Sequence, residues 1–401
     1  MGDAQQLAQQ QAQQLVDERI DRLLAECPPA TTEPTIFWGR QFDLGLAWVQ
    51  HAHGDGGLDL DSNWQVRIDE RLQAAGASFD NRSRNLIGIG MGGATIATHG
   101  TPEQRARLLR PLFTAEEIWC QLFSEPGAGS DLAGLATTAV PEGDEWVVNG
   151  QKVWTTFGHF ARWGMLVART DPNVVKHAGL TYFVCDMQAP GVEVRPLFQM
   201  TGEAEFNEVW FTDVHLSDDL RLGAVGQGWS VAMTTLMNER VAIGGRVGAR
   251  GDGLIGSAVD AWQAGGGTAA DRDRLVEFWI EAEALRLTSA RSADAQRSGA
   301  PGPEGSTMKL HWAELNKDLT TFTLGLLGED AMRYPGGYTF DRPIAPSLSS
   351  AMPHAAFLRA RANSIEGGTS EVLKSIIGER VLGLPREPRT DRDVPWREVP
   401  R

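Results

Sequence analysis

Cysteine is scarce in this chain of 401 residues. Its three cysteines, Cys27, Cys120 and Cys185, stand far apart without Cys-x-x-Cys spacing, so they predict buried free thiols rather than a metal site or a disulfide framework. No uninterrupted apolar stretch is long enough to span a membrane, and the opening MGDAQQLAQQ has neither the basic nor the apolar part of a signal peptide. We therefore expect a cytoplasmic protein without membrane insertion.

Positive charge is also in short supply. The chain has 37 Lys and Arg residues against 52 Asp and Glu, a net charge of -15, and no basic run offsets it. This balance argues against nucleic acid and against anionic membrane surfaces as partners. The apolar content of 42% is ample for two or three domains with cores of their own.

Two common nucleotide-binding motifs are missing as well. The sequence has no GxGxxG that follows a predicted strand and has an acidic residue about twenty positions further on, and it has no GxxxxGK[ST]. Neither a Rossmann domain nor a P-loop is therefore predicted.

Hydrophobic periodicity divides the chain into helix, strand and helix. From Thr35 to Trp119 the pattern is mainly helical, between Gln121 and Leu222 short runs alternate apolar and polar residues, and helical spacing returns at Gly228. We predict an α+β fold with the following parts: an N-terminal α-helical domain (1–119), an antiparallel β domain (120–222), a C-terminal α-helical domain (223–384) and an extended or mobile tail (385–401).

Local signals refine this outline. Val16, Ile20, Leu23 and Leu24 recur at helical spacing and predict an amphipathic first helix. A further helix should begin at Thr101, and Asn149-Gly150 predicts the type I′ turn of a hairpin that runs on to Thr156. The four glycines between Asn85 and Gly100 fit either room for a bulky ligand or close helix packing.

The most informative stretch is Cys120–Leu135, CQLFSEPGAGSDLAGL. Its Gly127 and Gly129 predict backbone geometry that a side chain would forbid. Short polar groups that could meet a ring edge or a phosphate stand around them: Ser124, Ser130 and Asp131. About twenty residues further on, QKVWTTFG (Gln151–Gly158) is predicted to present Trp154 and Thr156 on one face of a strand.

Together these two segments resemble the signature of the acyl-CoA dehydrogenase family. The similarity extends from about Pro34 to Arg389 and includes the C-terminal phrase IEGGTSEVLKSIIGERVLGLPREPR. The resemblance implies a β-barrel middle domain between two helical domains, and FAD as cofactor. It also implies oxidation of an acyl-CoA to the α,β-enoyl-CoA, with hydride transfer to flavin N5 and electron-transferring flavoprotein as electron acceptor.

The resemblance also implies roles for individual residues. By this resemblance the isoalloxazine edge would contact Gln121, Phe123 and Ser124. Thr156 would hydrogen-bond near N5 and Trp154 would pack on the ring. Ser130 would stand at the mouth of the substrate site, beside the pantetheine or the CoA phosphates, and among the cofactor contacts. Thr369 and Glu371 correspond to positions near the FAD adenosine.

The general base departs from the commonest family pattern. Where many members have a glutamate directly before Gly-Thr, this chain has Gly367, and Glu366 stands one residue too early. The family's second solution places the base before an arginine on the first helix after the β domain, which here is Glu239, followed by Arg240. Leu236 and Ile243 lie at i−3 and i+4, an apolar setting expected to raise a carboxylate's pKa. We predict Glu239 as base, with Arg240 guiding the acyl-CoA.

Two segments typical of homomeric members are absent. Neither Arg-x-Phe-Gly nor Gln-x-x-Gly-Gly-x-Gly, which complete the neighbouring subunit's FAD site, occurs in the expected regions. Arg272 or Arg274 could replace the lost arginine, or a second acyl-CoA dehydrogenase-like subunit could supply it. A homo-oligomer and a heteromer both remain open, as do a non-catalytic partner subunit and a flavin monooxygenase-like relative.

Overall fold

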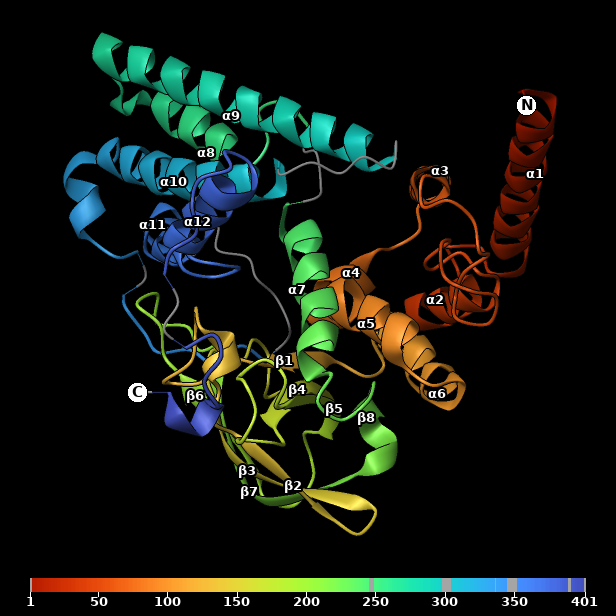
Figure 1. Ribbon diagram of the computed structural model, residues 1–401. Coiled ribbons are helices and arrows are strands. Elements are labelled where there is room, and N and C mark those ends of the chain that lie inside the picture. The colour runs from red at the N-terminus through yellow and green to blue at the C-terminus, as the bar shows by residue number, and fades with distance from the viewer. Residues whose placement is uncertain are drawn as a thin grey trace.

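A computed structural model describes residues 2–244, 249–297, 304–335, 337–344, 352–388 and 391–399. Along the chain a sheet follows one group of helices and precedes another, which confirms the predicted order of helix, strand and helix. In Figure 1 the sheet lies at the bottom, with the N-terminal helices on the right and most of the C-terminal helices at the upper left. Within the described ranges, no helix is both long and apolar enough to cross a membrane.

The N-terminal part is helical. Its elements are α1 (Gly2–Glu26), α2 (Pro34–Asp43), α3 (Trp64–Ala74), α4 (Asp80–Arg84), the π-helical turn η1 (Gly88–Gly92), α5 (Gly93–His99) and α6 (Pro102–Phe113). The predicted first helix is confirmed, because Val16, Ile20 and Leu23 are fully buried on one face of α1. The predicted helix start is confirmed too: the Thr101 hydroxyl accepts from the Gln104 amide at 3.2 Å, and the Gln104 side chain accepts from the Thr101 amide at 2.8 Å.

Two of the glycines between Asn85 and Gly100 serve close packing. A Cβ at Gly88 would stand 2.5 Å from the Asn85 side chain, and one at Gly93 would stand 2.8 Å from the Trp48 ring. Since atoms cannot approach so closely, any larger residue would force these neighbours to move. At these two positions the glycines are needed for close contacts with Asn85 in the same segment and with Trp48 in the loop after α2, rather than for packing between two helices.

The middle part is one eight-stranded sheet. Its strands are β1 (Trp119–Leu122), β2 (Thr138–Glu142), β3 (Glu145–Lys152), β4 (Trp163–Arg169), β5 (Leu180–Asp186), β6 (Val192–Leu197), β7 (Phe206–Ser217) and β8 (Arg221–Leu222). They run in the order β6-β7-β3-β2-β4-β5-β8, with β1 beside β4. Most neighbours are antiparallel, but β1 and β2 both pair with β4 in parallel.

The sheet is not closed, so the predicted barrel is wrong. Its end strands β6 and β8 do not pair with each other in the fully described stretch from Trp119 to Leu222. A barrel needs its first and last strands to meet. Here β8 is only two residues long and the chain then leaves the sheet for the next helix, so no strand spans the remaining gap.

The predicted Asn149-Gly150 turn is wrong as well. The β2–β3 hairpin turns at Gly143-Asp144, because Glu142 pairs with Glu145. Asn149 and Gly150 lie inside β3, where the register with β7 shifts between Val148 and Gly150. A Cβ at Gly150 would stand 2.5 Å from the Thr137 hydroxyl, so this glycine is required by a close approach within the sheet rather than by a turn.

The C-terminal part is helical again. Its elements are α7 (Gly228–Gly244), α8 (Leu254–Ala261), the π-helical turn η4 (Trp262–Gly266), α9 (Ala269–Arg297), α10 (Glu304–Gly325), α11 (Pro353–Ala360) and α12 (Ser370–Arg380). The predicted return of helix at Gly228 is confirmed. Most of the loop predicted around Pro301 lies outside the described residues.

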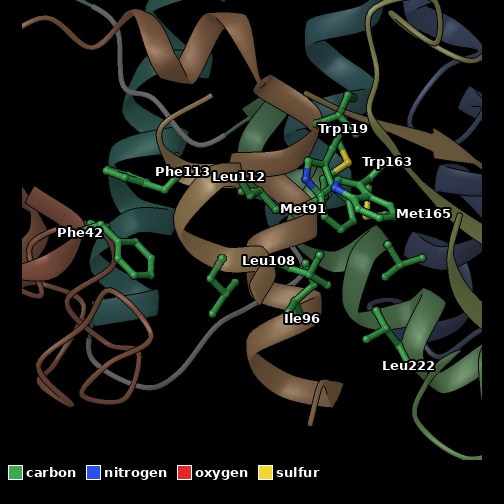
Figure 2. Packing of buried hydrophobic residues seen from close by; sticks show 14 of the residues in the cluster. Phe42, Met91, Ile96, Leu108, Leu112, Phe113, Trp119, Trp163, Met165 and Leu222 are labelled. Carbon is green, nitrogen blue, oxygen red and sulfur yellow. The ribbon is translucent and has the colours of Figure 1, made fainter. Parts of the chain in front are cut away.

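One buried apolar cluster joins the N-terminal helices to the sheet and to α7 (Figure 2). Leu112 comes from α6, Trp119 from β1 and Met165 from β4, while Val231 extends the same cluster into α7. The opposite face of the sheet and the C-terminal helices have separate clusters. The shared core therefore fixes α7 on the sheet at β4 and β5, and β1 pairs with β4. Glu239 lies on α7 and Gln121 on β1.

Candidate active site

The two motif segments found in the sequence lie side by side. The amide of Val153 donates to the carbonyl of Ser124 at 2.9 Å. Directly before it, the Lys152 ammonium donates to the Phe123 carbonyl at 3.0 Å and to Glu125 Oε1 at 2.8 Å. The end of β1 and the end of β3 thus form one surface, with Ser124 next to the Trp154 segment.

A buried ion pair holds this junction together. The Lys152 side chain is 0% exposed and that of Glu125 is 8% exposed. The amides of Ala136 and Thr137 donate to the same carboxylate at 2.6 and 2.9 Å. Burial raises the pKa of Glu125, but the attraction of Lys152 and the donated hydrogen bonds outweigh it, and the pKa lies below its ordinary value. Burial lowers the pKa of Lys152, an effect that Glu125 opposes.

The segment after β3 is irregular, so the prediction that Trp154 and Thr156 share a strand face is wrong. The strand ends at Lys152, and Trp154 has a φ of 62°, a left-handed conformation in which the alternation of a strand cannot continue. Buried Asn207 fixes this backbone: its carbonyl accepts from the Thr155 amide at 3.0 Å, and its side chain donates to the Thr155 carbonyl at 3.0 Å.

This segment presents an aromatic ring and an unused hydroxyl. Trp154 is 57% exposed and meets Phe206 edge-on, with the ring centroids 5.8 Å apart. Beside it, the Thr155 hydroxyl is buried without a hydrogen-bond partner among the described residues. A buried hydroxyl without a partner is unfavourable, so this group fits a bound ligand.

The glycine-rich turn has ordinary backbone angles. Neither Gly127 nor Gly129 has a positive φ, so the prediction of a backbone that a side chain would forbid is wrong. The turn is instead closed by two backbone hydrogen bonds of 3.0 Å between Glu125 and Ala128. A Cβ on either glycine would meet nothing within 4 Å, so the outer side of the turn is open, and Ser130 beyond it is exposed.

Phe123 faces away from this surface. Its side chain is buried in the core and meets Tyr182 edge-on, with centroids 5.9 Å apart. Any contact of Phe123 with a ligand at the surface must therefore involve its backbone.

Glu239 reaches the first motif from α7. Gln121 Nε2 on β1 donates to Glu239 Oε2 at 3.3 Å. Two residues that the sequence analysis assigned to the site, 118 positions apart, therefore contact each other. Leu236, one turn earlier, packs against the core. The side chains of Arg240 and Ile243 lie outside what the structure describes.

Glu366 is held in a different arrangement. Arg359 donates to both of its oxygens, at 3.1 and 2.8 Å, and the Asn363 side chain donates to Oε1 at 2.8 Å. The next residue, Gly367, has a φ of 62°, a conformation that a glutamate would adopt only with strain. The backbone here therefore disfavours a base at position 367 and keeps Glu366 in a structural ion pair.

A buried lysine pins the same loop. Lys309 donates to the carbonyls of Asn363 and Gly368 at 2.8 and 2.7 Å. Burial lowers its pKa, while the negative charges of Glu366 and Glu239 act in the opposite direction. Lys309 thus places a positive charge against the C-terminal loop.

Thr369 and Glu371 lie at the start of α12. The Thr369 hydroxyl accepts from the Val372 amide at 3.2 Å and caps the helix, and Glu371 is exposed in its first turn. The capping bond accounts for Thr369 structurally. Their predicted contact with the FAD adenosine stays a prediction.

The regions where family segments are missing have structures of their own. Arg272 and Arg274 are exposed on α9, where they pair with Asp273 and Glu277. The segment after α10 docks on the loop between β6 and β7 instead: the amide of Ala204 donates to the Asp341 carbonyl at 2.9 Å.

Comparison with known proteins identifies the family. Residues 2–116, 120–214 and 226–382 match the family models described as the N-terminal, middle and C-terminal domains of acyl-CoA dehydrogenase. The acyl-CoA dehydrogenase IpdE1 of Mycobacterium tuberculosis is 37% identical over 361 residues, which cover 86% of this chain and 86% of that protein. The chain belongs to the acyl-CoA dehydrogenase family. It is therefore a relative of oxidoreductases that act on acyl-CoA thioesters.

Solved structures share the fold of this acyl-CoA dehydrogenase family member. The ChsE4-ChsE5 complex from Mycobacterium tuberculosis matches with a TM-score of 0.69 at 26% identity, covering 94% of this chain and 98% of that chain. A glutaryl-CoA dehydrogenase from Mycobacterium smegmatis in complex with FADH2 matches with a TM-score of 0.67 at 20% identity, covering 96% and 98%.

Proposed function

We propose that this chain is an FAD-dependent acyl-CoA dehydrogenase that forms an α,β-enoyl-CoA, with Glu239 as general base. The observation that carries the proposal is the contact between Glu239 and Gln121, because it brings a carboxylate from α7 to the β1 segment that the resemblance assigns to flavin. The ion pair of Glu366 with Arg359 supports the choice between the two glutamates.

The residues at the end of β1 and after β3 fit a flavin. The buried Thr155 hydroxyl needs a partner, Trp154 offers an exposed ring held by a fixed backbone, and the turn at Gly127 is open on its outer side. We assign the ring edge to Gln121, Ser124 and Thr156, with Phe123 contributing its backbone, and keep Thr369 and Glu371 as contacts of the adenosine end. Bound FAD would supply the hydride acceptor.

The protein's own contribution is to hold and move a proton. Glu239 removes the proton from the carbon next to the thioester carbonyl, and Gln121 orients the carboxylate through Oε2. Ser130 binds the CoA end of the substrate, and Arg240 guides the ester into the site.

The proposal predicts that anaerobic addition of a suitable acyl-CoA bleaches the flavin of the loaded protein. A panel of straight, branched and polycyclic CoA esters, followed by absorbance spectroscopy, provides the measurement. If fully loaded flavin stays oxidised with every ester, the dehydrogenase proposal fails. Rapid oxygen consumption by the reduced protein without desaturation would instead favour a monooxygenase-like reaction.

We further propose that a second, different subunit of the same family completes the FAD site, and that electron-transferring flavoprotein accepts the electrons. The chain lacks both family segments that reach into a neighbouring FAD site, and the region after α10 docks on its own β6–β7 loop. One solved structure that this chain resembles is named as a complex of two differently named components, ChsE4 and ChsE5.

The proposal of a second subunit predicts that the chain purified alone contains little flavin. Co-expression with candidate acyl-CoA dehydrogenase-like neighbours should raise the amount of FAD per chain, measured from flavin absorbance and protein concentration after gel filtration. A homo-oligomer that holds one FAD tightly per chain would contradict the heteromer and direct attention to Arg272 and Arg274.

A further inference from the structure

The loop that carries Ser130 is anchored by a buried arginine. Arg169 on β4 is 2% exposed. Its guanidinium donates to the carbonyls of Ala133 at 2.6 Å and Leu135 at 3.1 Å. These carbonyls belong to residues 130–135, the segment between the glycine-rich turn and β2, so Arg169 fixes its course against the sheet.

Trp396, from the far end of the chain, completes this anchor. Its indole nitrogen donates to the Gly134 carbonyl at 3.1 Å, across 262 positions of sequence. Its ring also covers the Arg169 guanidinium, with 4.2 Å between Arg169 Cζ and the ring centroid. The carbonyls of three consecutive loop residues are thus held by one arginine and one tryptophan.

Backbone bonds and an ion pair dock residues 391–399 on the middle domain (Figure 1). The Trp396 amide donates to the Val174 carbonyl at 2.9 Å, and the Arg397 amide to the Pro172 carbonyl at 3.1 Å. Lys176, at the end of the same turn, bridges the carboxylates of Asp131 and Asp391. Residues 391–399 of the predicted tail therefore lie on the middle domain as turns and a short 3-10 helix, rather than as an extended segment, and are tied to it at several points.

We propose that residues 391–399 form a clasp that positions the 130–135 loop, and with it Ser130, for the CoA end of the substrate, and that Trp396 is the positioning residue. The inference rests on the proposed function. A loop fixed before binding loses less conformational entropy when it takes up a ligand, so the clasp acts on affinity. Glu239 reaches the site from α7, so proton removal in the bound complex should not depend on the clasp.

The test uses the full chain, with its partner subunit if one is needed for flavin, and the variants Trp396→Ala and Trp396→Phe. Calorimetric titration with CoA itself measures binding without turnover. Trp396→Ala should raise the Kd for CoA on the order of tenfold, since a stacking contact and a hydrogen bond are lost. Trp396→Phe keeps a ring over Arg169 and should recover part of the affinity.

A pair of thioesters separates positioning from general damage. With an acyl-CoA that bleaches the wild-type flavin, Trp396→Ala should raise the Kd but keep the limiting rate of flavin reduction within about twofold of wild type. With the same acyl group on N-acetylcysteamine, which lacks the nucleotide, the Kd should not change. The matched control Arg397→Ala removes a side chain that is 60% exposed and pairs with Glu398, and it should bind CoA as wild type does.

Several results would overturn the clasp. One such result is an unchanged Kd for CoA in Trp396→Ala, and another is an equal increase in the Kd for both thioesters. A third is a lower flavin content and a lower melting temperature without a separate loss of CoA affinity. Each would show that the segment has only a structural role. Wild-type protein that does not bind CoA would refute it too. Wild-type protein that binds CoA while no ester bleaches its flavin would refute the proposed function alone, since the Trp396 variants would still be compared by their Kd for CoA.

Discussion

Glu239→Gln should leave flavin binding intact and slow reduction of the flavin by acyl-CoA at least about 100-fold, the effect typical of losing a general base. The replacement keeps the size of the side chain, and its amide oxygen can still accept the hydrogen bond from Gln121 Nε2. It cannot take up the substrate proton. Anaerobic stopped-flow absorbance at saturating ester measures the rate, and the flavin spectrum before mixing checks loading.

Glu366→Gln is the matched control, because it makes the same chemical change at the other candidate for the general base. Glu366 accepts hydrogen bonds from Arg359 and Asn363. Its replacement should therefore lower the melting temperature, while the rate of flavin reduction should fall far less than in Glu239→Gln. If Glu366→Gln abolishes flavin reduction while Glu239→Gln reduces its flavin at nearly the wild-type rate, the assignment of the base is wrong.

The secondary structure could be predicted from the sequence wherever the apolar period was clear. The short runs that became β4, β5, β6 and β7 were predicted as strands, and α1 followed from Val16, Ile20 and Leu23. The expected alternation of buried and exposed residues holds along most of β7 but not along β4, which is buried throughout. The Asn149-Gly150 turn failed because a local turn signal cannot reveal that a distant residue lies too close for a Cβ, as Thr137, directly before β2, does here. Closure of the sheet depends on contacts between distant strands, which no local pattern encodes.

The candidate site was predicted in part. Motif segments identified Gln121, Ser124 and Trp154, and the structure brings the two segments together. Asn207 and Lys309 were missed. A polar residue within a strand or helix normally indicates a solvated face, and only tertiary packing reveals that these two side chains are buried against backbone carbonyls.

The ion pair between Glu125 and Lys152 was missed for the same reason, although both residues stand inside the motifs. The signal available in the sequence was a lysine directly before the Val-Trp of the second motif. Its strand neighbours alternate between the core and solvent, and Lys152 occupies a core-facing position. A charged residue at such a position needs a buried partner of opposite charge, which the sequence supplies in Glu125.

Lys152→Met should destabilise the protein by about 3–5 kcal/mol, because it leaves the Glu125 carboxylate buried without its cation. The free energy of unfolding, from urea titrations followed by tryptophan fluorescence, measures the loss. Arg195→Met breaks the exposed pair with Glu193 on β6 and should change the free energy of unfolding far less, because solvent screens an exposed pair. The double variant Lys152→Met with Glu125→Gln removes both charges and should recover much of the loss, whereas equal losses in the single and double variants would contradict the ion pair as the cause.

The pH dependence of the stability of Lys152→Met tests the same explanation independently. In the wild type the pKa of Glu125 is lowered from 4.5, so the stability it contributes is complete above the unfolded-state pKa and is lost as the pH falls through the folded-state value. Without Lys152, burial is opposed only by the hydrogen bonds from Ala136 and Thr137. Because burial is the largest influence on this carboxyl, we expect its pKa in the folded state to rise above that in the unfolded state. The variant should then be penalised most at neutral pH, where the unfolded chain ionises the group freely, and the deficit relative to wild type should shrink in mildly acidic buffer. A deficit that grows on acidification would show that Lys152 stabilises the fold in some way other than by neutralising Glu125.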